Sequence, residues 1–210
     1  MHRFRRPAAL LLAWLALACG VFAGGAALAA SPGDMSLGNP KARIQVVEYA
    51  SLSCPHCAHF NADVFPAFKA KYIDTGKVHF VLREFLTPPA NVAAAGWMLA
   101  RCAGPAKYFS VVDGVFRSQT QWVEGADIRA ILLAVANANG LSESQFEACL
   151  RDETGRQALE SRVQRAIDEG QVNSTPTIDI NGRRMTTVPQ SLADLEAAMA
   201  KAPKRKPGGG

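Results

Sequence analysis

The stretch that decides the fold is IQVVEYASLSCPHCAHFNADVFPAF, residues 44–68. Its first residues are mostly apolar and β-branched, which predicts a buried strand over about residues 43–50. After it, large apolar side chains recur at helical spacing, which predicts a helix over about residues 55–75. Cys54 and Cys57 therefore lie where a strand passes into the N-terminus of a helix.

This position favours a thiolate, because unpaired backbone N–H groups and the positive end of the helix dipole stabilise an anion there. Cys54 lies at the tip of the helix, and Cys57, one turn further along, is expected to be more buried. A stabilised thiolate favours the reduced form, so the corresponding disulfide is a strong oxidant. His56 is the side chain placed to add to this stabilisation. The pattern indicates a redox-active dithiol.

Two other interpretations of the cysteine pair are a metal site and a purely structural disulfide. A metal could take Cys54 and Cys57 with His56 or His59. Structural zinc sites usually take four ligands from two separated pairs, and the sequence has no second pair of that spacing nearby. We therefore predict no metal and no bound cofactor, since the sulfurs themselves can carry the electrons. The tight spacing at a strand–helix junction argues against a structural bridge.

The N-terminus has the pattern of a secretory signal peptide over residues 1–29. Arg3, Arg5 and Arg6 precede an apolar stretch that ends in a small-x-small motif at residues 27–29. An uncleaved anchor helix is the main alternative, because the stretch is long enough to span a bilayer. Cys19 is a poor lipoprotein site. Export would leave four cysteines, and an even number in an oxidising compartment indicates two pairs.

The net charge of +5 comes from the two ends of the chain. Without the three leader arginines and the four basic residues of positions 201–206, 16 basic residues face 18 acidic ones. A body near −2 does not indicate a nucleic-acid-binding face. Residues 203–210 are expected to form a disordered basic and glycine-rich tail.

The rest of the chain divides into three parts. Residues 31–41 are expected to form a polar lead-in to the first strand. A second strand is expected at 78–85, after the dithiol helix. Residues 88–170 show helical periodicity and no strand pattern. Strands return at 177–180 and 183–187 around Asn181-Gly182, a strong two-residue hairpin turn, and a last helix follows Ser191. The order predicts an α/β fold, a mixed four-stranded sheet built from residues 30–87 and 171–202, with an inserted all-helical subdomain.

These motifs resemble those of the DsbA family of thioredoxin-fold oxidoreductases. The matching segments are Val47-Glu48-Tyr49, the CPHC motif at 54–57, the helical insertion, and Thr175-Pro176-Thr177. The resemblance covers about residues 44–199. It implies a thioredoxin-like fold and a periplasmic thiol:disulfide oxidoreductase that donates its Cys54–Cys57 disulfide to exported proteins with free cysteines. It also implies re-oxidation by a membrane partner of the DsbB type.

The resemblance implies a role for each matching residue. Cys54 would be the nucleophile, Cys57 the resolving cysteine, and His56 a stabiliser of the Cys54 thiolate. Pro176 would be cis, with Thr175 facing the dithiol and its backbone pairing with an extended substrate.

A buried charge pair is also implied by the resemblance. Glu48 would be the buried acid beneath the dithiol, with Lys77 as its partner. The alternative is that both side chains are solvated.

Cys102 and Cys149 fall in the helical block, each among apolar residues on a predicted helix. We predict a structural disulfide between them, with two buried free thiols as the alternative. Two other functions stay open at this stage. One is a disulfide isomerase or reductase, although those of the DsbC and DsbG type carry an N-terminal dimerisation domain for which residues 31–41 are too short. The other is an anchored peptide-binding or chaperone module. We expect a monomer.

Overall fold

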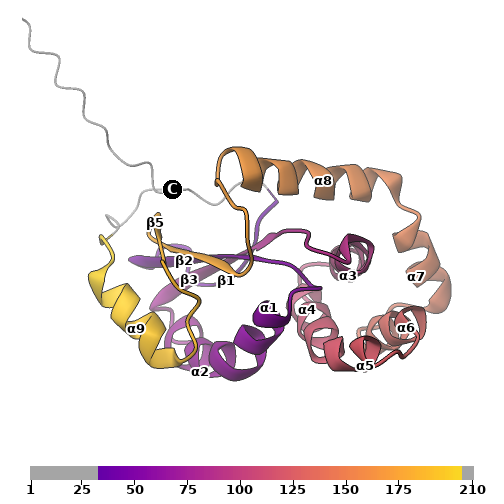
Figure 1. Cartoon of the computed structure of the whole chain (residues 1–210), viewed down its shortest axis with the longest axis horizontal. Helices are drawn as coiled ribbons and strands as arrows, with labels where there is room; N and C mark the ends of the chain where they lie inside the picture. Colours follow the sequence, from indigo (N-terminus) through magenta and orange to yellow (C-terminus); the bar gives the residue numbers. More distant parts are fainter. Residues whose placement is uncertain (1–32, 205–210) are drawn as a thin grey trace, which may run out of the picture.

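The computed structural model describes residues 33–204. The expected signal peptide, Cys19 and most of the expected tail lie outside these residues. A five-stranded mixed sheet forms the centre of the molecule, with the order β1-β3-β2-β4-β5 (Figure 1). The strands are β1 Met35–Gly38, β2 Ile44–Ala50, β3 Val78–Glu84, β4 Thr177–Ile180 and β5 Arg183–Arg184.

The thioredoxin-like fold is confirmed, but the sheet has one strand more than predicted. β2 and β3 are parallel, and β4 is antiparallel to β2, as the order of elements requires. The additional strand, β1, pairs antiparallel with the outer side of β3. Its four residues lie between Gly33 and Pro40 in the segment expected to be a polar lead-in. Local pattern alone did not reveal it, because its pairing partner is far away in the sequence.

The turn between β4 and β5 matches the prediction. Asn181 and Gly182 both have positive φ, at 49° and 79°, as a two-residue hairpin turn of this type requires. Ile180 then faces Arg183, and Asp179 faces Arg184. The returning strand is shorter than expected and ends at Arg184.

The helix after the dithiol is continuous from residue 55 to 73 but not uniform. It consists of α1 Pro55–His59, the π-helical turn η1 Phe60–Val64, α2 Phe65–Phe68 and a second π-helical turn, η2 Lys69–Ile73. Pro66 has no N–H to donate to the preceding turn and disturbs its geometry. The backbone widens just before it, so that the N–H of Phe65 reaches the carbonyl of Phe60.

The inserted block is helical throughout. It contains α3 Ala90–Cys102, α4 Tyr108–Arg117, α5 Gln119–Val123, α6 Ile128–Ala138, α7 Glu143–Leu150 and α8 Glu153–Asp168. A capping box begins α7, in which Ser142 and Gln145 each bond the other's backbone N–H. The chain closes with α9 Leu192–Lys201, capped by Ser191.

Alternation along β2 assigns its side chains to two faces. Val46, Glu48 and Ala50 face the helices α1, α2 and α4, whereas Val47 and Tyr49 face the end of α8. Figure 1 shows α8 along one side of the sheet and α1 and α2 along the other. The helical insertion therefore also covers part of the sheet, because its last helix returns across it.

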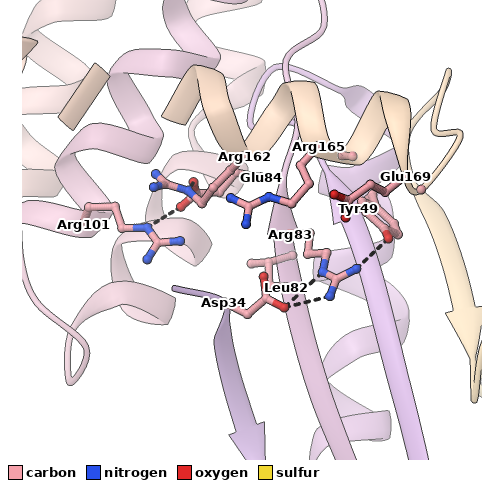
Figure 2. Close-up of a pocket in the computed structure, with 11 residues that line it drawn as sticks. Asp34, Tyr49, Leu82, Arg83, Glu84, Arg101, Arg162, Arg165 and Glu169 are labelled. Carbon is pink, nitrogen blue, oxygen red and sulfur yellow. Dashed lines mark hydrogen bonds and ion pairs between the residues drawn. The ribbon is translucent and has the colours of Figure 1, made fainter. Parts of the chain in front are cut away.

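A buried carboxylate joins the sheet to the insertion. The Glu84 side chain is fully buried at the end of β3 (Figure 2). It accepts hydrogen bonds from Arg101 of α3 and Arg162 of α8, each at 2.5 Å, and from the Tyr108 hydroxyl of α4 at 3.0 Å. Three helices of the insertion are thus attached to one strand. Nearby, Arg83 binds Asp34 at 2.9 Å, just before β1.

Candidate active site

The two cysteines of the CPHC motif lie at the C-terminal end of β2. Cys54 is the N-cap residue of α1 and Pro55 occupies the first turn, where its missing N–H would have had no partner. Cys54 is 6% exposed and Cys57 is completely buried. Both are free thiols in this structure.

A second loop, distant in sequence, completes the site. The Thr175–Pro176 peptide bond is cis. The carbonyl of Thr175 accepts a hydrogen bond from the Cys54 sulfur at 3.2 Å. The structure therefore brings the dithiol and the Thr-Pro-Thr segment together, while the Thr175 hydroxyl oxygen is buried with no hydrogen-bond partner among residues 33–204.

The surroundings of Cys54 lower its pKa to about 5 from an ordinary value of 9.0. The largest cause is the hydrogen bond from the Cys57 thiol, and burial acts in the opposite direction. Hydrogen bonding at Thr175 and to the backbone N–H groups of Cys57 and His56 lowers the pKa further. Cys54 is therefore mostly a thiolate at neutral pH.

The second sulfur behaves in the opposite way. Burial raises the pKa of Cys57 well above its ordinary value, and the neighbouring Cys54 thiolate raises it further. The Cys54 sulfur is thus an anion and the Cys57 sulfur a hydrogen-bond donor. The anionic sulfur and the donating sulfur stabilise the reduced dithiol together. The oxidised form is therefore a stronger electron acceptor than a disulfide without this arrangement.

Comparisons with known proteins agree with this geometry. A family model described as thioredoxin matches residues 30–201. The chain belongs to the thioredoxin family. Within this family it is of the DsbA type, because the crystal structure of alpha-DsbA1 of Wolbachia pipientis matches it with a TM-score of 0.75 and 29% identity, over 84% of this chain and 94% of that chain.

Two further relatives of this thioredoxin-family chain carry functional names. A Rickettsia bellii protein, provisionally named a protein-disulfide oxidoreductase, is 33% identical over 170 residues. Those residues are 80% of this chain, which spans 64% of the relative's length. A crystal structure named protein-disulfide isomerase, from Novosphingobium aromaticivorans, matches with a TM-score of 0.70 and 25% identity, over 80% of this chain and 96% of that one.

The two histidines near the dithiol, His56 within the motif and His59 after it, are placed differently from the cysteines. His56 is exposed, and the bond that it gives to the Cys54 sulfur comes from its backbone N–H. His59 forms an ion pair with Asp63 at 2.7 Å on the helix surface. Between residues 33 and 204, no three side chains of the metal-binding types gather into a site.

The expected ion pair between Glu48 and Lys77 is not formed in this thioredoxin-family structure. Glu48 pairs in register with Leu82, whereas Lys77 precedes Val78, which pairs with Ile44. Lys77 therefore lies five residues along the strand from the position opposite Glu48, roughly 16 Å away. The Lys77 ammonium lies instead over the ring of Tyr72, at 5.9 Å from its centroid. Glu48 is buried with one carboxyl oxygen lacking any partner among the described residues.

Sequence reasoning missed one residue that holds the DsbA-type site. Gln119, buried at the start of α5, donates from its side-chain amide to the carbonyls of Leu52 at 2.8 Å and Cys54 at 3.2 Å. It thereby anchors the active-site loop to the insertion. A glutamine in a polar stretch between helices carries no sequence pattern that distinguishes it from a solvated one.

The remaining cysteines are joined. Cys102 at the end of α3 and Cys149 in α7 form a disulfide with an S–S distance of 2.04 Å and a Cα–Cα distance of 6.1 Å. The bridge connects two helices of the insertion. The bridge thus lies within the helical insertion, whereas the free thiols of Cys54 and Cys57 lie at the candidate active site.

Proposed function

We propose that this chain is an exported thiol:disulfide oxidoreductase that donates the Cys54–Cys57 disulfide to proteins with reduced cysteines. The observation that supports the proposal best is the division between the two sulfurs, with the pKa of Cys54 lowered to about 5 and that of Cys57 raised. A stabilised Cys54 thiolate is a good leaving group. The functional names of the relatives point in the same direction.

In this proposal the reaction proceeds in two exchanges. A substrate thiolate attacks the Cys54 sulfur of the oxidised protein, forming a mixed disulfide, and the Cys57 sulfur leaves as a thiolate that takes up a proton. A second substrate thiolate then attacks the substrate sulfur of the mixed disulfide. The substrate disulfide forms, the Cys54 thiolate leaves, and two electrons have passed from substrate to protein.

Other residues have supporting roles in this proposal. The Thr175 backbone next to the sulfur would pair with an extended substrate segment. The His56 imidazole, exposed beside Cys54, would stabilise the thiolate. Glu48, whose charge acts on Cys57, would receive or supply the proton of that thiol.

The partners and the compartment are part of the same proposal. Substrates would be exported proteins with free cysteines, and a membrane partner of the DsbB type would re-oxidise the dithiol in the periplasm. The basic and apolar leader of the sequence supports export. The bridge between Cys102 and Cys149 is consistent with an oxidising compartment.

The deciding experiment is the equilibrium potential of the Cys54–Cys57 couple against glutathione. A donor of disulfides should have a potential well above the value of about −270 mV of thioredoxin and nearer to the −120 mV of DsbA. Oxidation of a reduced peptide with two cysteines should proceed in parallel and stop in a Cys54→Ala variant. A potential at or below that of thioredoxin would overturn the assignment.

Disulfide isomerisation is the second candidate function. The name of the Novosphingobium aromaticivorans structure favours it. An isomerase needs its dithiol reduced at the start, so the discriminating measurement uses a substrate with scrambled disulfides and reduced protein. This second function would be favoured if the reduced protein restored the native disulfides of the scrambled substrate faster than the oxidised protein oxidised the reduced substrate.

A further inference from the structure

A cavity of about 300 Å³ lies between the sheet and the helices that cover it. Its wall combines side chains of β2 and β3 with α2 and α4, and it is mainly apolar. Four phenylalanines, Phe65, Phe80, Phe109 and Phe116, contribute to it. The rings of Phe65 and Phe80 lie 4.9 Å apart and those of Phe80 and Phe109 6.4 Å apart. This volume is at the lower end of the range of small-molecule sites.

Glu48 contributes a buried carboxyl group to the lining of this cavity. The residue is only 4% exposed, and its Oε1 atom has no hydrogen-bond partner within the described part of the chain. A buried carboxyl without a partner is costly, and the ionised form is more costly still. The free energy of this arrangement would fall if a ligand offered the carboxyl a hydrogen-bond donor or a cation.

The charged side chains at the rim of the cavity already have partners. The Lys69 ammonium binds Asp74 at 2.6 Å. Asp113 accepts from Asn61 at 2.8 Å and from Arg117 at 2.7 Å. Glu48 is therefore the ionisable group of the lining that lacks a partner among residues 33–204, and a cation would supply one.

We propose that this cavity binds a small apolar amine, with the ammonium group at Glu48 and the apolar part among the four phenylalanines. A carboxylate and aromatic faces both attract a cation, the first by charge and the second through the ring quadrupole. An ammonium group supplies up to three donors, whereas an alcohol supplies one. Charge complementarity thus selects an amine over a neutral molecule of equal size.

Binding should also move a proton. Burial, and to a lesser extent the Cys54 thiolate, raise the pKa of Glu48 to about 8, so the free carboxyl is mostly protonated at pH 7. The ammonium favours the ionised carboxylate, and complex formation therefore releases a proton. Other titratable groups around Glu48 are Cys54 and Cys57 on α1, and Lys69 and Asp113 at the rim. The two rim groups are held in ion pairs, and oxidising the dithiol removes titration of the cysteines.

The test compares two probes of the same shape, 2-phenylethylamine and 2-phenylethanol, by calorimetry on the oxidised full-length protein at pH 7. The amine is expected to bind about tenfold more tightly, a difference of about 1.4 kcal/mol. Titration in two buffers of different ionisation enthalpy should show proton release with the amine only. Equal affinity of the two probes, or no binding of either, would overturn the proposal.

Three variants locate the site. Glu48→Gln should remove the preference for the amine, while Glu124→Gln, the same change at an exposed position of the chain, should retain it. Leu37→Trp, at a half-buried position of the cavity wall, should weaken both probes. Retained amine preference in Glu48→Gln would contradict the assignment. If that variant does not fold, the NMR shifts that the amine induces in the wild-type protein locate the bound probe. Shifts at residues away from the four phenylalanines would also contradict the assignment.

Discussion

The thiol of Cys57 is the largest cause of the low pKa of Cys54. Cys57→Ala removes this donor, so the pKa of Cys54 should rise from about 5 toward the ordinary value of 9.0. Cys57→Ser retains a hydroxyl donor and should raise it less. Titration of thiolate absorbance near 240 nm measures both. Identical values in the two variants would show that the donor at position 57 is not responsible.

Glu48 should make stability depend on pH. Burial raises its pKa from 4.5 to about 8, so the folded state binds this proton more tightly than the unfolded state. Stability is then fully present below pH 4.5 and decreases as pH rises toward 8. In the oxidised protein, Glu48→Gln should gain roughly 1 to 3 kcal/mol over the wild type between pH 5 and pH 8. Urea unfolding at each pH tests this, and a difference that stays constant would contradict it.

Among the elements, the Cys102–Cys149 bridge closes a loop with a sequence separation of 47. In the chain-entropy account a loop of this size stabilises by about 4 kcal/mol, less any strain. Changing both cysteines to alanine should lower the free energy of unfolding by about 2 to 4 kcal/mol while the low pKa of Cys54 is kept. Chemical denaturation and thiolate titration of the same variant separate the two effects. An unchanged unfolding midpoint would remove the structural role.

Gln119 is the contact by which the short helix α5 holds the active-site loop. Gln119→Leu leaves the carbonyls of Leu52 and Cys54 with one buried donor fewer, which should cost about 1 to 3 kcal/mol. Gln119→Glu tests the same contact, because a carboxylate cannot donate to a carbonyl. Gln121→Leu, at an exposed position of α5, is the control and should change stability little. Equal effects at positions 119 and 121 would contradict the anchoring role.

The elements whose patterns are local could be predicted from the sequence. The strand before the dithiol, the helix after it, the Asn181-Gly182 turn and the cap at Ser142 all follow from neighbouring residues. β1 could not be predicted, because its four residues form a strand only by pairing with β3. In the sequence, β3 comes after the whole dithiol helix. The partner assigned to Glu48 was wrong for a related reason, since strand register separates Lys77 from it.

At the scale of the whole molecule, Glu84 joins the sheet to three helices of the insertion. Glu84→Ala would leave Arg101 and Arg162, which are 26% and 19% exposed, without their carboxylate. We expect a loss of about 3 to 5 kcal/mol. Glu160→Gln, which removes an exposed ion pair with Arg156, is the control and should cost less than about 1 kcal/mol. Urea unfolding compares the two, and similar losses would show that the buried network adds nothing.

The pairing of β2 with β4 has a consequence for the timing of maturation. Val46 faces Ile180 in the sheet, so the whole helical insertion must be synthesised before this ladder can form. Contacts between residues so distant in sequence form late in folding. Thr175, whose side chain helps to lower the pKa of Cys54, lies beside the sulfur only when this ladder closes. A newly made chain therefore lacks the contribution of Thr175 to thiolate stability until β4 has paired with β2.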